Sequence, residues 1–183
     1  MIAEFRDHLN RVLHLTITQA PLSLVSVRKG FALSFRRSGR LDPAEVPLQT
    51  KLGVAHLSLA QTCLTEREGD EHRLRTIRYR YALRPEGDSE PRLRWEYVRE
   101  FLERNPCRHH MQGPVAVPFG RQELNLNDLH LPTGYTTMED VIRFCIVDLG
   151  VQPLSPEWHE VLEESYRLFK TKFAPRGPSP SSA

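Results

Sequence analysis

The sequence lacks the features that would place it in a membrane or outside the cell. Its longest uninterrupted apolar run is Phe144-Cys145-Ile146-Val147, whereas a helix that spans a bilayer needs about 18 apolar residues or more. No signal peptide is visible, because charged and polar residues interrupt any apolar stretch near the start. The three cysteines, Cys63, Cys107 and Cys145, are an odd number without a short pairing interval. These absences predict a cytoplasmic protein with reduced thiols and no contact with a membrane.

Common catalytic motifs are absent as well. The chain contains no GxxxxGK phosphate loop, no GxGxxG after a strand, no HExxH and no paired CxxC. This argues against a P-loop NTPase, a Rossmann enzyme, a zincin or a zinc ribbon, and no cofactor is predicted. Small nuclease folds remain, since their catalytic residues are often dispersed along the chain.

What is present is typical of one globular domain. The chain has 183 residues, 39% of them hydrophobic, with 25 basic and 23 acidic side chains and a net charge of +2. Of the basic residues, 21 are arginine. A guanidinium can bind a phosphate with two parallel hydrogen bonds, which an ammonium cannot do with the same geometry. We expect a single domain over residues 1–174 and a disordered Pro/Ser-rich tail over 175–183.

Hydrophobic periodicity predicts a helix, then strands, then two helices. Helical spacing covers 2–13, and Thr136-x-x-Glu139 and Ser155-Pro156 indicate the starts of two further helices. Strands are predicted at 22–27, 31–35, 52–64, 74–83 and 93–101, and 38–47 is predicted to be a loop. This order predicts an α+β fold: a mainly antiparallel β-meander whose apolar face is covered by the N-terminal helix and the two C-terminal helices.

The most secure structural prediction is the hairpin formed by 74–83 and 93–101. Strict alternation places Ile77, Tyr79, Tyr81, Trp95 and Tyr97 on a core face. The opposite face carries Thr76, Arg78 and Arg80 on the first strand, with Glu96 and Glu100 as cross-strand partners for the arginines.

Reactive side chains concentrate at 105–113, just after this hairpin. If the segment is extended, Arg108 and His110 share one face, and Cys107, His109 and Met111 share the other. An imidazole beside a fixed cation can transfer protons while the guanidinium holds a phosphate, so Arg108 and His110 are candidate catalytic residues. His130 or Tyr135, from the following loop, is the candidate second proton-transfer group.

Two other interpretations of this segment stay open. It can be a polar strand end with solvated histidines. It can also bind a metal, since Cys107, His109, His110 and His130 are all possible zinc ligands, although their spacing is not that of common structural zinc units. We predict no metal.

A basic cluster near the N-terminus suggests a second function. Arg36, Arg37 and Arg40 could neutralise phosphates and bind nucleic acid in a salt-dependent way. The same cluster could equally be a solvated loop or dock an acidic partner.

Several of these elements together resemble the TumE-like toxins of bacterial toxin–antitoxin systems. They are Tyr79-Arg80-Tyr81, a turn with Gly87, Leu93-Arg94-Trp95-Glu96, the histidine pair 109–110 and the helix beginning at 137–141. The resemblance covers residues 74–149. The chain differs in a longer gap between Trp95 and the histidines and in an added helix after Pro156. The resemblance implies a toxin that acts on RNA or another nucleotide-bearing target and is neutralised by a cognate antitoxin.

Two hypotheses follow. In the first, the protein is a metal-independent endoribonuclease-like toxin in which His110 transfers protons and Arg108 anchors a phosphate. In the second, it is a non-catalytic module that binds protein or nucleic acid. The enzyme hypothesis requires Arg108, His110 and either His130 or Tyr135 to converge in one concave pocket. Side chains that point to separate surfaces would favour the binding module.

Overall fold

The computed structural model describes residues 1–28, 30–36, 43–68, 71–99, 108–114, 116–119, 122–125 and 131–173. Its helices are α1 (Ile2–Thr16), α2 (Met138–Val147), α3 (Trp158–Leu168) and a terminal π-helical turn, η1 (Phe169–Phe173). None of the helices in this part of the chain is long and apolar enough to cross a membrane. The predicted α+β class is confirmed, with one helix before the strands and two after them.

The large sheet is antiparallel, and most of it follows the chain in order. Its strands are β1 (Leu22–Val27), β2 (Gly30–Phe35), β3 (Val46–Thr50), β4 (Gly53–Glu68), β5 (Glu71–Pro85), β6 (Leu93–Val98), β7 (His109–Gln112) and β10 (Leu131–Pro132). The spatial order is β1-β2-β4-β5-β6-β7-β10, and β3 pairs with β4 beyond the end of β2. A separate two-stranded sheet contains β8 (Ala116–Phe119) and β9 (Gln122–Asn125).

The β5–β6 hairpin forms as predicted. Tyr79 lies opposite Tyr97, and Tyr81 lies opposite Trp95. Arg80 pairs with Glu96 on the other side of the sheet, where its Nε lies 3.1 Å from the carboxylate. Glu100, the second predicted acidic partner, lies outside the described residues.

Some strands were not predicted. β3 occupies the end of the segment expected to be a loop, and it contains Pro47. Proline cannot donate to a ladder, so its presence argued against a strand; β3 tolerates it because it pairs with β4 alone. β10 has only two residues, too few for any sequence pattern to reveal.

One β-bulge changes the predicted face of Thr76. Thr62 of β4 pairs with Arg78 and Cys63 pairs with Thr76, so Ile77 has no partner on β4. The extra residue reverses the alternation of β5 on its N-terminal side. Thr76 therefore lies on the tyrosine side of the sheet, where its Oγ1 accepts a hydrogen bond of 2.8 Å from Nε2 of Gln61. The prediction that Thr76 shares a face with Arg78 is wrong.

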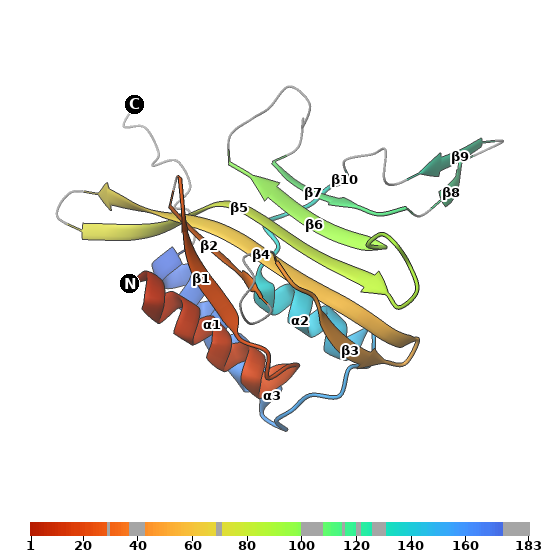
Figure 1. Ribbon diagram of the computed structural model, residues 1–183, viewed down its shortest axis with the longest axis horizontal. Coiled ribbons are helices and arrows are strands. Elements are labelled where there is room, and N and C mark those ends of the chain that lie inside the picture. The colour runs from red at the N-terminus through yellow and green to blue at the C-terminus, as the bar shows by residue number, and fades with distance from the viewer. Residues whose placement is uncertain are drawn as a thin grey trace, which may run out of the picture.

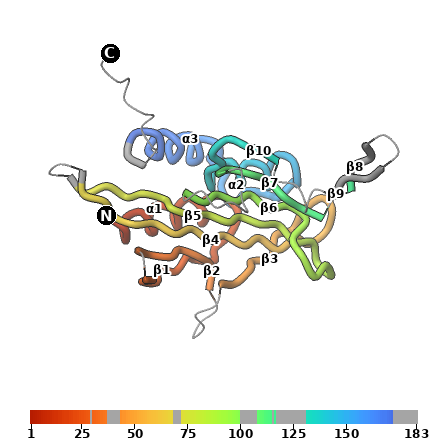
Figure 2. The backbone as a smooth tube through the Cα atoms, turned by 90° about the horizontal axis from the view of Figure 1, so that it is seen from above, coloured from red at the N-terminus to blue at the C-terminus, as the bar shows by residue number. Residues whose placement is uncertain are grey.

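The helices cover the tyrosine side of the sheet (Figure 1). Helices α1 and α3 lie against one another. Figure 2 shows the strands of the large sheet side by side. The core between these layers includes Leu13 of α1, Ile142 of α2, Leu162 of α3 and Leu57 of β4, all fully buried. Burial of these apolar side chains is the main force that holds the helices on the sheet.

Both C-terminal helices begin one or more residues after their predicted starts. Thr137, not Thr136, caps α2: its hydroxyl accepts from the Asp140 N–H, and the Asp140 carboxylate accepts from the Thr137 N–H. Helix α3 begins at Trp158, because residues 155–157 form a turn closed by a bond from the Trp158 N–H to the Ser155 carbonyl. Both caps obey local chemistry, but two adjacent threonines or a Ser-Pro pair do not identify which residue takes the role.

Candidate functional site

The two histidines of strand β7, His109 and His110, point to opposite sides of the sheet, as the alternation predicted. His109 lies on the tyrosine side and stacks on Tyr97, with ring centroids 4.4 Å apart and planes 10° apart. Its Nδ1 lies 3.5 Å from the hydroxyl oxygen of Tyr79, and its ring is 5.2 Å from that of Tyr135. We call these four residues the His–Tyr cluster.

Burial sets the protonation of the His–Tyr cluster. It lowers the pKa of His109, and electrostatic interactions with Arg108 and His110 lower that pKa further. Burial also raises the pKa of the Tyr79, Tyr97 and Tyr135 phenols. Because charged forms are disfavoured here, the cluster presents a neutral imidazole, able to accept a proton, beside phenols that are protonated near neutral pH.

His110 belongs to a different arrangement on the other side of the sheet. Its side chain is 1% exposed, and its Nε2 lies 3.4 Å from one carboxylate oxygen of Glu96. The other oxygen of Glu96 pairs with Arg80. The three side chains form a row across β5, β6 and β7.

The predicted catalytic residues do not converge among the described residues. Arg108 is exposed just before β7, His110 is buried beside Glu96, and Tyr135 lies on the opposite side of the sheet next to His109. His130 lies outside the described residues, as does Cys107. Tyr135 is thus near the histidine pair, but its neighbour is His109, which the sequence analysis had not chosen. One sequence signal pointed to His109: Tyr79, Tyr97 and His109 all occupy odd-numbered positions in the neighbouring segments. In the sheet, Tyr79 lies opposite Tyr97, and Tyr97 lies opposite His109.

A row of arginines dominates the side of the sheet that the helices leave uncovered. We call this the arginine face: six arginines on one side of β5 and β6, with the β5 bulge between the second and third and Ala82 between the fourth and fifth. They are Arg73, Arg75, Arg78, Arg80 and Arg84 of β5, and Arg94 of β6. Without the bulge, Arg73 and Arg75 would point to the helices, because their sequence numbers differ in parity from those of the other four.

Carboxylates of the described part of the chain pair with several arginines of the arginine face. Arg75 pairs with Glu66, Arg80 with Glu96 and Arg84 with Glu45. Arg78 is exposed and has no ion-pair partner among these residues, and Arg80 remains 45% exposed despite its partner. The face therefore keeps guanidinium groups that can reach an external anion.

The predicted nucleic-acid-binding residues are described only in part. Arg36 follows the last residue of β2, and alternation places it on the same side of the sheet as the arginine face. Its side chain is half-buried. Arg37 and Arg40 lie outside the described residues.

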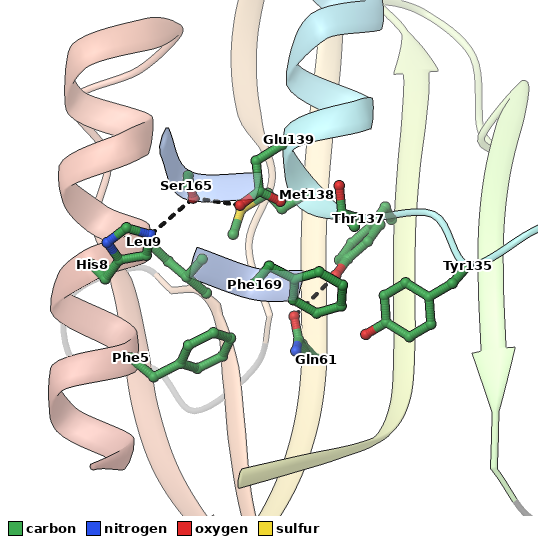
Figure 3. Close-up of a pocket in the computed structure, with 11 residues that line it drawn as sticks. Phe5, His8, Leu9, Gln61, Tyr135, Thr137, Met138, Glu139, Ser165 and Phe169 are labelled. Carbon is green, nitrogen blue, oxygen red and sulfur yellow. Dashed lines mark hydrogen bonds between the residues drawn. The ribbon is translucent and has the colours of Figure 1, made fainter. Parts of the chain in front are cut away.

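A small polar pocket lies between the helices and the sheet (Figure 3). Ser165 of α3 donates a hydrogen bond to the Glu139 carboxylate of α2, and its Oγ lies 2.8 Å from Nε2 of His8 in α1. On the sheet side, the Tyr81 hydroxyl donates to Gln61. The cavity of about 20 Å³ has room for one water molecule, so these polar groups join the three helices and do not form a substrate site.

No group of three or more His, Cys, Asp or Glu side chains that could hold a metal ion occurs among the described residues. His109 and His110 point to opposite sides of the sheet and so cannot ligate one ion together. Two other members of the alternative zinc set, Cys107 and His130, are not among the described residues.

The lowered pKa of His109 predicts a pH dependence of stability. The folded state favours the neutral imidazole, so this contribution is complete above the unfolded pKa of about 6.5 and is lost as the pH falls through the folded value. His109→Phe, which keeps a ring against Tyr97, should make the free energy of unfolding less dependent on pH between about 7 and 5. Urea unfolding at several pH values measures this, with His72→Phe at an exposed position as the matched control. An unchanged pH slope in His109→Phe would contradict the assignment.

Comparison with known proteins finds no matching family model, and no curated protein or solved structure of significant similarity. The function must therefore be argued from the geometry and chemistry of the sites themselves.

Proposed function

We propose that this protein binds RNA through the arginine face. The observation that supports the proposal is the β5 bulge, which brings Arg73 and Arg75 onto the same side of the sheet as Arg78, Arg80 and Arg84. Bulges re-aim side chains at the cost of a regular ladder. Here the result is a row of guanidinium groups, interrupted at Ala82, on a face that none of the described helices covers.

The chemistry of that row suits phosphate. A guanidinium presents several N–H donors in a planar fork and can bind a phosphate with two parallel hydrogen bonds. Arginines two residues apart on one strand, such as Arg78 and Arg80, lie about 7 Å apart, since each residue rises about 3.3 Å. Such a row can contact successive phosphates of one nucleic-acid strand. The predicted convergence of Arg108, His110 and Tyr135 is not seen among the described residues, which also favours binding over cleavage by that set.

The binding test uses fluorescence anisotropy of a labelled RNA at about 50 to 200 mM salt. Affinity should fall linearly on a log–log plot, because each neutralised phosphate releases counterions. Arg78→Ala should weaken binding and reduce the magnitude of the salt slope by about one, the value for one lost phosphate contact. Arg167→Ala, at an exposed position of α3, is the matched control and should bind like wild type. Equal affinities for both variants and wild type would contradict the proposal.

The His–Tyr cluster favours a second candidate function, metal-independent cleavage of RNA, which is also what the resemblance to TumE-like toxins implies. The neutral imidazole of His109 would remove the proton from a ribose 2′-hydroxyl, whose oxygen then attacks the adjacent phosphorus. The bond to the 5′-oxygen breaks, and that oxygen takes a proton from the Tyr135 phenol. Arg108, exposed next to the cluster, would hold the phosphate. The products are a 2′,3′-cyclic phosphate and a 5′-hydroxyl, and a cognate antitoxin is the expected partner.

Cleavage of single-stranded RNA in EDTA tests this second candidate. His109→Ala should lower the rate about 10²- to 10⁴-fold, the range for one acid–base group. His110→Ala tests the original prediction, in which His110 transfers the proton, and should have the smaller effect if His109 does so. Activity that EDTA abolishes, or no cleavage by folded protein, would contradict the candidate. Binding at the arginine face would be unaffected by that outcome.

A further inference from the structure

Among the described residues, the arginine face contains no Phe, Tyr or Trp side chain on which a base could stack. The Phe, Tyr and Trp side chains of the large sheet in the described strands lie on the helix side: Phe31, Phe35, Tyr79, Tyr81, Trp95 and Tyr97. Proteins that read single-stranded RNA on a sheet do so with several exposed aromatic rings. The rings on the uncovered side are imidazoles, those of the buried His110 and of the half-buried His56 beside Arg84.

The strands beside the arginines carry short side chains instead. On β4 they are Ser58, Ala60 and Thr62, which alternate with buried residues and lie next to Ala82, Arg80 and Arg78 of β5. On β2, the half-buried Ala32 continues this surface, whereas Ser34 is buried. A surface of short side chains lets a wide, stiff ligand approach the guanidinium groups, and it supplies few contacts to individual bases.

The length of the row also fits a wide ligand. From Arg73 to Arg84 the strand extends about 35 Å at about 3.3 Å per residue. That is about one helical turn of a nucleic-acid duplex. A duplex holds its phosphates in a fixed pattern over this length, whereas a flexible single strand must be ordered on binding and has no rings here to stabilise it.

From these observations we infer that the arginine face binds the phosphate backbone of a nucleic-acid duplex without reading its sequence. The inference rests on the proposed function, since it specifies the nucleic acid that the same face takes. The contacts are to phosphates, so RNA and DNA duplexes are both possible sources of that backbone, and sequence should have little effect on affinity.

The test compares four labelled ligands at about 150 mM salt: an RNA duplex and a DNA duplex of about 20 base pairs, oligouridine of about 20 nucleotides, and polyglutamate as an acidic polypeptide. We expect the RNA duplex, or both duplexes, to bind at least about tenfold more tightly than oligouridine, with a steeper salt slope. Scrambling the duplex sequence should change the affinity less than about threefold. If the DNA duplex binds as tightly as the RNA duplex, the face accepts either backbone. If it binds more weakly, the face prefers the RNA backbone.

The variant Arg78→Ala should weaken duplex binding and reduce its salt slope by about one, while thermal unfolding shows that it is folded. Arg78→Lys keeps the charge but loses the planar guanidinium that can bind a phosphate with two hydrogen bonds. Its affinity should therefore lie between those of Arg78→Ala and wild type. Oligouridine that binds as tightly as the duplexes, through Arg78, would overturn this inference and leave the proposed RNA binding intact. No Arg78-dependent binding of any nucleic acid would overturn both. Polyglutamate binding as tight as that of the duplexes would show that the face recognises acidic polypeptides, which also overturns the inference.

Discussion

Replacing Tyr79 by Ala should lower the free energy of unfolding by about 3 to 5 kcal/mol, the usual cost of truncating a buried aromatic residue. The side chain is 1% exposed, and its ring stacks on Tyr81 with centroids 4.6 Å apart. It also contacts the rings of Tyr97 and Tyr135, at 5.5 Å and 5.4 Å. Truncation leaves a cavity at the centre of the His–Tyr cluster, where β5, β6 and the segment before α2 meet. Urea unfolding measures the loss.

Two further variants test the contribution of the Tyr79 hydroxyl and the effect of burial on the cost of removing a ring. Tyr79→Phe keeps the ring but removes the oxygen that accepts a hydrogen bond of 2.9 Å from the Thr136 N–H, so it should cost about 1 to 3 kcal/mol. Trp95→Ala should cost less than Tyr79→Ala although the indole is larger, because Trp95 is only half-buried against Phe144. If Trp95→Ala were the more destabilising change, the positions of these rings would be wrong.

The second large effect is expected at Glu139, which is 5% exposed in the first turn of α2. Glu139→Leu removes the carboxylate that accepts from Ser165 and should lower stability by about 1 to 3 kcal/mol, since a buried hydroxyl loses its acceptor. Loss of a negative charge near a helix N-terminus adds about 0.3 to 1 kcal/mol. Glu139→Gln keeps an acceptor oxygen and should be milder.

A double-mutant cycle tests whether Glu139 and Ser165 act together. Ser165→Ala alone should cost less than Glu139→Leu, and the two losses should be less than additive, with a coupling of about 0.5 to 3 kcal/mol. Equal or greater stability of Glu139→Leu would contradict the prediction. It would mean that apolar packing at this site is worth more than the hydrogen-bonded chain through His8.

Alternation of polar and apolar residues predicted the strands correctly where the two faces of a strand differ in polarity. Tyr79, Tyr81, Trp95 and Tyr97 could be assigned to one side because they occupy every second position between charged residues. The same rule separated His109 from His110. It worked because the side-chain period of a strand is two, and one buried face fixes which parity is inside.

The partners of these side chains could not be predicted in the same way. Tyr135 was expected near the histidine pair, but its approach to His109 depends on the short strand β10, which brings the following segment back along β7. The chain joining Glu139, Ser165 and His8 links residues that are far apart in sequence. Local patterns describe which side of an element is apolar, and they do not describe which elements meet.

By itself, the sequence determined the fold class, the core side of the hairpin and the opposite orientations of His109 and His110, because these depend on periodicity within one strand or helix. Only the tertiary structure decided the arginine face. Arg73 and Arg75 differ in parity from Arg78 and Arg80, so alternation alone placed the two pairs on opposite sides of the sheet. The bulge at Ile77 unites them, and it exists because β4 pairs with β5 in two registers that differ by one residue.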